Sequence, residues 1–137
     1  MKKGSSLLIV ITIISVFLIL AVFLTKIVYN NYSAVRNSVI REQAFYLAEA
    51  GIEKGKAELS HNPGWYTDLP YYLSDNDKWL IGYAVGQQEN LGEGAYKIVR
   101  EKGKNRLYSI GYKGEGIVVL KLTFTNPPFK NLEWSEL

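Results

Sequence analysis

The hydrophobic pattern begins with one uninterrupted apolar run near the start of the chain. From Leu7 to Leu24 the residues carry no charge, and the only polar side chains are Thr12 and Ser15. At about 1.5 Å per residue, a helix of this length is just long enough to cross the core of a bilayer. No small-x-small cleavage step follows, unlike the pattern after a secretory signal peptide. The run therefore predicts a retained membrane-spanning helix that continues into the next segment.

Beyond this run, apolar and small residues recur at spacings of three and four, as on one face of a helix. They are Val35, Val39, Ala44, Leu47, Ala48, Gly51, Ile52, Gly55 and Leu59. The pattern stops at Asn62-Pro63-Gly64, since proline and glycine end a helix. We expect one helix reaching about Ser60. Its small residues (Ala44, Ala48, Gly51, Gly55) would allow close contact with a sheet of the same chain, the favoured partner, or with a neighbouring helix.

The second half of the chain contains short alternating runs that predict strands. Three are expected, at residues 95–100, 106–112 and 117–124, and residues 79–85 are a candidate first strand within an irregular stretch at 66–93. The connections at 101–105 and 113–116 have the length of hairpin loops, which makes the sheet antiparallel.

A proline pair after Asn126 should end the last strand, and residues 129–137 should form a surface tail containing Trp134. The predicted fold class is α+β, with a long N-terminal helix, transmembrane and then amphipathic, packed on a small antiparallel β-sheet head. Tyr96 and Ile98, or their neighbours, should cover Leu47, Ile52 and Leu59, because a small sheet needs a helix as its second layer.

Charge sets the expected orientation of the apolar run. Lys2 and Lys3 precede it and Lys26 follows it, which favours a cytoplasmic N-terminus and an exported segment 26–137. The whole chain has a net charge of +3, from 16 Lys and Arg against 13 Asp and Glu. Without the two N-terminal lysines the balance is +1, so bulk charge gives little support to nucleic-acid binding. Cysteine is absent, which excludes disulfides and thiolate metal sites.

Few residues suggest catalysis, and we expect neither an enzyme nor a cofactor or metal site. His61 is the only histidine and lies where the helix should end. Asp75-Asn76-Asp77 spaces two carboxylates as some calcium loops do, but the rest of an EF-hand loop is missing, so a turn is favoured. Two Gly-Glu-Gly sequences, at 92–94 and 114–116, are interpreted as turns rather than phosphate cradles.

Basic and aromatic residues alternate along the predicted strands. Lys97, Arg100, Lys102, Lys104, Arg106 and Lys113 are interleaved with Tyr96, Tyr108 and Tyr112. Such a surface is a candidate contact for DNA, above all through Lys97, Arg100, Lys102, Lys104 and Arg106. The favoured alternative is an ordinary solvated sheet face, on which lysine and arginine also discourage aggregation at strand edges.

Two segments carry a resemblance to a known family. Met1-Lys2-Lys3-Gly4 with its apolar run, and the stretch Gln43-Ala44-Phe45-Tyr46-Leu47-Ala48-Glu49-Ala50-Gly51, resemble type IV pilins and type II secretion pseudopilins, the PilX-type minor pilins in particular. The resemblance covers about residues 1–60, whereas the head is similar only in its strand plan. It implies a leader at 1–4, a filament-core helix at 5–25, an amphipathic helix at 26–60 and a β head at 61–137.

The resemblance also implies how the chain would be processed and assembled. A prepilin peptidase would cut after Gly4, where only a residue without a side chain fits, and Ser5 would then be N-methylated. Assembly would use the apolar helix through Leu7, Leu8, Ile9, Val10, Ile13, Ile14 and Phe17. Major pilins carry Glu at the position of Ile9, which pairs with a neighbouring N-terminal amine, so Ile9 indicates a minor subunit.

The partners implied are other pilin subunits, an inner-membrane assembly platform, the prepilin peptidase and membrane lipid before assembly. The chain would lie in the cell membrane and then in an extracellular filament. The alternative is a signal-anchored surface module that binds DNA or another ligand and is never polymerised.

Overall fold

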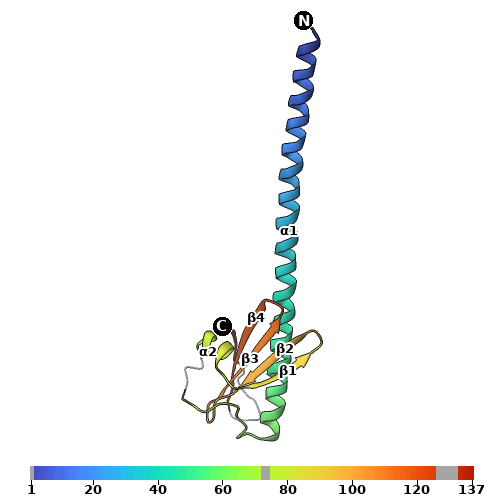
Figure 1. The fold of residues 1–137 in the computed structure, drawn as a ribbon. Helices are drawn as coiled ribbons and strands as arrows, with labels where there is room; N and C mark the ends of the chain where they lie inside the picture. Colours follow the sequence, from blue (N-terminus) through green and yellow to red (C-terminus); the bar gives the residue numbers. More distant parts are fainter. Residues whose placement is uncertain (1, 72–74, 126–132) are drawn as a thin grey trace. The chain divides into compact units, whose positions relative to one another are not determined.

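One helix, α1 (Lys2–His61), accounts for almost the whole first half of the chain (Figure 1). The computed structural model describes residues 2–71, 75–125 and 133–137. By contacts the chain divides into two units, Met1–Asn37 and Ser38–Leu137. The predicted end of the helix is confirmed within one residue. There the Asn62 N–H still donates to Glu58 O at 2.8 Å, and the Asn62 side chain accepts from the Gly64 N–H at 3.0 Å in a turn.

The second unit, which we call the head, contains an antiparallel sheet of five strands in sequential order. The strands are β1 (Gln87–Leu91), β2 (Gly94–Val99), β3 (Arg106–Lys113), β4 (Gly116–Thr123) and β5 (Glu133–Glu136). The three strands expected from alternation correspond to β2, β3 and β4, with every end within one residue. Gly92 and Gly114 have φ of 60° and 54°, as the turns predicted at these positions require.

The candidate first strand at 79–85 is wrong, because this stretch begins with a short helix, α2 (Asp77–Gly82). The side chain of Asn76 accepts the Trp79 N–H at 3.0 Å and so caps the helix. Leu80 is fully buried, and its apolar neighbours Trp79 and Ile81 pack around the same cluster. The apolar run therefore supplies Leu80 of α2, and Ala84 just after it, to a buried cluster, and the first strand is the more polar β1.

The predicted surface tail at 129–137 is partly corrected. Glu133–Glu136 pairs with β4 as the fifth strand, with Thr123 opposite Glu133 and Leu120 opposite Glu136. Its residues are nonetheless exposed, including Trp134 as predicted. The prolines expected to end the preceding strand, and the first residues of the tail, lie outside the described residues.

The main core lies between the sheet and the part of α1 within the head. As predicted, Leu47, Ile52 and Leu59 share a buried cluster with Tyr96 and Ile98. The strip of small residues is also confirmed as a contact with the sheet. A Cβ built on Gly111 of β3 would lie 1.9 Å from the carbonyl oxygen of Ala44, so the two backbones meet there without an intervening side chain.

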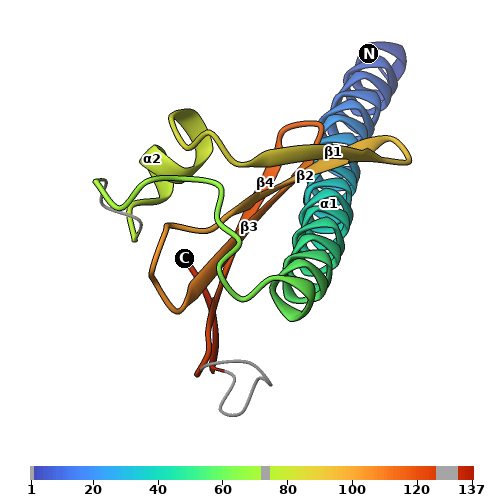
Figure 2. The same cartoon turned by 90° about the horizontal axis from the view of Figure 1, so that it is seen from below.

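The opposite face of the sheet carries a second, smaller core. Leu80 and Ala84 pack there with Val99, Tyr108, Ile110 and Val119. Figure 2 shows α2 and the last turns of α1 on opposite sides of β3 and β4. The head therefore has the expected helix layer on one face and an unpredicted helical cover on the other.

Candidate functional site

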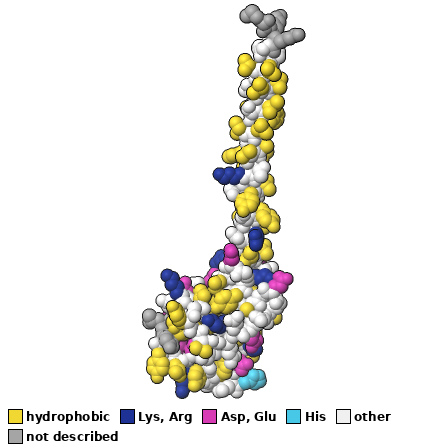
Figure 3. Space-filling model, in the orientation of Figure 1, with side chains coloured by type: hydrophobic (Ala, Val, Ile, Leu, Met, Phe, Trp, Pro, Cys, Tyr) yellow, Lys and Arg dark blue, Asp and Glu magenta, His cyan; other side chains and the backbone are white. Residues whose placement is uncertain are grey.

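The apolar segment of α1 is exposed on every side. Within the described part of this segment, the most hydrophobic 18-residue stretch has none of its residues buried. The candidate assembly residues Leu7, Leu8, Ile9, Val10, Ile13, Ile14 and Phe17 are 49–68% exposed. Figure 3 shows hydrophobic side chains along this whole stretch. An isolated helix that is apolar all round needs lipid or protein about it.

The few polar side chains of this segment are satisfied internally. Thr12 and Ser15 donate to Leu8 O and Ile11 O, both at 2.8 Å. Thr25 donates in the same way to Ala21 O at 2.9 Å. These bonds to the preceding turn leave no hydroxyl that needs an external partner. By length and composition this helix is able to cross a membrane.

The candidate processing residues lie in the first turns of α1. Gly4 and Ser5 are both exposed. A Cβ built on Gly4 would meet no atom within 4 Å, so the fold itself does not require glycine there. A requirement for glycine at this position would have to come from a partner such as a peptidase.

The structure removes Lys97 and Arg100 from the predicted basic surface. Both are buried, at 7% and 5% exposure. Lys97 Nζ donates to Ala84 O at 3.0 Å and to Ile81 O at 3.3 Å, where α2 ends. Burial lowers the pKa of the Lys97 ammonium, partly offset by the nearby carboxylate of Asp68.

Arg100 holds the loop that follows α1. Its guanidinium donates to Pro63 O at 3.2 Å and to Trp65 O, and lies 5.9 Å from the ring centroid of Phe124. Burial lowers its pKa. Lys97 and Arg100 therefore belong neither to a DNA-binding surface nor to a solvated sheet face. Both side chains are buried and donate hydrogen bonds to main-chain carbonyls.

The remaining basic residues do not form one open surface. Lys102 lies over the ring of Tyr66 at 5.2 Å, and Lys104 is exposed. Lys113 pairs with Glu93 at 2.9 Å across neighbouring hairpin turns. Arg106 is engaged with Asp75 at 3.0 Å. Only part of the predicted set is thus accessible to an anionic partner.

Asp75 joins three donors on the face of the sheet that α2 covers. Its carboxylate accepts from Tyr108 Oη at 2.8 Å, pairs with Lys121 Nζ at 2.8 Å and also pairs with Arg106. Hydrogen bonds from Lys121 and Tyr108 lower the pKa of this carboxyl. Within the described ranges no three His, Cys, Asp or Glu side chains are grouped to hold a metal ion. Asp75 thus anchors the chain just before α2.

Asp68 anchors a second loop. This buried carboxylate accepts the N–H groups of Val85 at 2.7 Å and Gly86 at 3.1 Å, and the hydroxyl of Thr67 at 2.7 Å. The loop after α1 is thereby tied to the segment that leads from α2 into β1. Sequence reasoning did not single out Asp68, since a lone aspartate in an irregular stretch gives no sign of burial.

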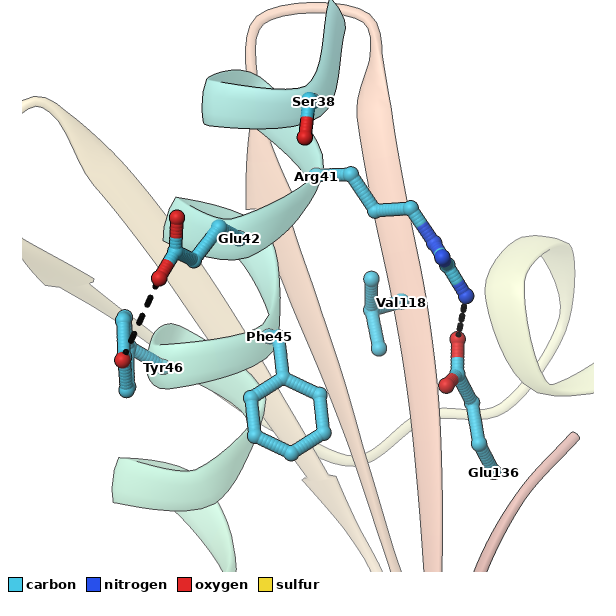
Figure 4. A pocket seen from close by; sticks show the side chains of 7 residues that line it. All are labelled: Ser38, Arg41, Glu42, Phe45, Tyr46, Val118 and Glu136. Atoms are coloured by element: carbon cyan, nitrogen blue, oxygen red, sulfur yellow. Dashed lines mark hydrogen bonds and ion pairs between the residues drawn. The ribbon is translucent and has the colours of Figure 1, made fainter.

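A pocket of about 380 Å³ opens on the head between α1, β4 and β5 (Figure 4). Phe45 and Val118 form its apolar part, and an ion pair between Arg41 and Glu136 closes one side at 2.7 Å. The other residues lining it are Ser38, Glu42 and Tyr46. The lining thus combines two apolar side chains with three charged ones, Arg41, Glu42 and Glu136. Phe45 and Tyr46 lie in the stretch that carries the pilin resemblance, whereas nothing in the sequence pointed to Glu136.

Comparison with known proteins adds no further constraint. No protein-family model, no curated protein and no solved structure matches this chain.

Proposed function

We propose that this chain is a membrane-anchored structural subunit that assembles through its apolar N-terminal helix. The proposed assembly is a type IV pilus or a related secretion or DNA-uptake filament, in which the chain is a minor pilin or pseudopilin. The observation that carries the proposal is that no residue of the most hydrophobic 18-residue stretch is buried, while the head has buried cores of its own. A segment of this kind is stable in lipid, or in a bundle of similar helices.

The N-terminal residues support the finer part of the proposal. The Lys2-Lys3-Gly4-Ser5 sequence directly precedes the apolar run, as in a prepilin leader. Lys2 and Lys3 favour retention of the N-terminus in the cytoplasm and export of the head. Ile9, in place of the glutamate of major pilins, leaves the amine of Ser5 without a partner from this type of subunit, which favours a low-copy role.

Intact mass tests the proposal. The chain should be isolated from membranes of cells with and without an active prepilin peptidase. We expect loss of Met1–Gly4 and addition of one methyl group on Ser5 only where the peptidase is active. A full-length, unmodified chain in peptidase-positive cells would refute the pilin proposal and leave a signal-anchored surface protein.

Gly4→Val provides the sharper comparison. A side chain at this position meets nothing within 4 Å in the fold, so the variant should fold normally while its leader is retained. Ser5→Ala is the matched control, and it should lose residues 1–4 like the natural chain. Equal cleavage of both variants would show that Gly4 is not a processing determinant.

A further inference from the structure

The C-terminal strand β5 is attached to the head mainly through its backbone. All four of its residues are exposed, and none of them belongs to either core cluster of the described chain. Its side-chain link to α1 is the pair between Arg41 and Glu136, whose side chains are 69% and 40% exposed. Ion pairs this exposed contribute little to stability. Release of β5 would therefore leave the two cores of the head intact.

The neighbouring strand, β4, is held in place by buried side chains on both of its faces. β4 supplies Val118, Leu120 and Leu122 to the main core and Val119 to the second core. Its place in the sheet is therefore fixed without β5. Without a partner on its outer side, β4 would present an open edge of β-branched and apolar residues, which is a ready template for another strand.

The pairing of β5 with β4 has a defined register of opposite residues. Leu120, Lys121, Leu122 and Thr123 face Glu136, Ser135, Trp134 and Glu133, respectively. The Leu137 N–H extends the ladder by donating to Val119 O at 3.0 Å. In Figure 2 the red C-terminal segment runs beside β4 at the edge of the sheet. The same segment of a second copy offers identical backbone groups and side chains.

We propose that β5 is exchanged between copies of this chain, so that Glu133–Glu136 of one copy completes the sheet of another in the same register. The exchanged strand also brings Glu136 to Arg41 of the accepting copy and so supplies one wall of the pocket around Phe45 and Val118. The occupant of the β4 edge is thus a second copy of this chain. The inference does not depend on the proposed filament function.

Exchange competes with pairing inside one chain, and this sets its concentration dependence. Only residues 124–132 separate β4 from β5 in the sequence, and a tether of that length gives an effective concentration in roughly the millimolar range. Exchange should therefore be rare in dilute solution and should increase when chains are crowded in a bilayer or an assembly. Because the swap replaces each contact with the same contact, the concentration of chains decides its extent.

Cysteine pairing tests the exchange directly, because the natural chain contains no cysteine. Thr123 and Glu133 are opposite in the ladder, and antiparallel neighbours lie within the Cα separations that a disulfide accepts. Full-length Thr123→Cys and Glu133→Cys chains, carrying different tags, are mixed in detergent micelles at several protein-to-detergent ratios. They are then oxidised with copper phenanthroline. We expect a covalent heterodimer whose yield rises with crowding and exceeds that of a control pair at least tenfold.

The control pair is Gln88→Cys with Glu133→Cys, since Gln88 lies on β1 at the opposite end of the strand order. It measures chance collisions between chains held in one micelle. A double variant, Thr123→Cys with Glu133→Cys in one chain, should form an internal disulfide and, once oxidised, should no longer exchange. A heterodimer yield no higher than that of the control pair would overturn the proposal. Failure of the double variant to close internally would overturn it as well, because the register itself would be wrong.

Discussion

The close approach of α1 to β3 at Gly111 gives the most demanding prediction for the head. A Cβ at Gly111 would lie 1.9 Å from Ala44 O and 2.6 Å from Ala48 N, both backbone atoms of the helix. Reaching an ordinary contact distance of 3.4 Å would separate helix and strand by about 1.5 Å. A backbone cannot rotate aside as a side chain can, so the shift must spread through the main core.

Gly111→Ala should therefore be strongly destabilising. Overpacking usually costs about 1–3 kcal/mol, and a clash with helix backbone belongs at or above the upper end. For a head of about 100 residues, each kcal/mol lowers the unfolding temperature by roughly 4–8 °C, so we expect a loss of about 12 °C or more. The fluorescence of Trp65, Trp79 and Trp134, all within the head, reports unfolding of the full chain in detergent.

Two comparisons separate this effect from a general sensitivity to alanine. Gly82→Ala, where a Cβ meets nothing within 4 Å, should change the unfolding temperature little. In Gly51→Ala the new Cβ would lie 2.1 Å from Ser109 Oγ, a buried side-chain atom that has no hydrogen-bond partner among the described residues. Ser109→Ala should therefore partly rescue Gly51→Ala but not Gly111→Ala. If Gly111→Ala melts like Gly82→Ala, the close contact inferred between helix and strand is wrong.

Three further outcomes follow from the buried and paired charges. Asp68→Ala removes the acceptor of two main-chain N–H groups and should cost about 2–6 kcal/mol, at about 1–3 for each group left unpaired, measured by thermal unfolding. Hydrogen bonds from Lys121 and Tyr108 lower the pKa of the Asp75 carboxyl, so the stability they contribute is present at neutral pH and is lost as the pH falls below about 4. Asp75→Asn should therefore reduce the loss of stability on acidification. A titration of unfolding temperature between pH 7 and 2 that is unchanged in this variant would contradict the assignment. Lys97→Ala should lower the unfolding temperature, while leaving any salt-dependent DNA affinity unchanged in a filter-binding assay.

The elements with strong periodicity were predictable from the sequence. Leu47, Ile52 and Leu59 recur at helical spacing and do meet Tyr96 and Ile98 in one cluster. These side chains recur on one helix face because that face is buried against the sheet, so the local pattern and the tertiary contact agree. The close helix–sheet contact was also predictable from the small residues, although its partner Gly111 was not.

The remaining features depend on contacts between distant parts of the chain. The run at 79–85 is apolar enough for a strand, and only its cap at Asn76 and the burial of Leu80 make it a helix. β5 is short and polar, and is a strand only because β4 offers it an edge. Lys97 bonds carbonyls 13 and 16 residues earlier in the chain, so its burial leaves no local trace in the sequence.

The candidate site divides in the same way. The apolar segment was predictable from composition alone, because an uncharged run long enough to cross a bilayer can be recognised without knowing any tertiary contact. The pocket does not, since its walls come from Phe45 on α1, Val118 on β4 and Glu136 on β5. No single stretch of sequence contains enough of it to be recognised.

The sequential strand order has a consequence for how the head folds. Each strand pairs with the next one along the chain, so the sheet can form as a series of local hairpins with small loop-closure costs. Docking of the α1 segment onto the sheet spans a longer separation, since Ala44 meets Gly111, which lies 67 residues later (111 − 44). We therefore expect docking of the helix, rather than strand pairing, to limit the folding rate. Gly111→Ala would slow folding as well as weaken the folded head.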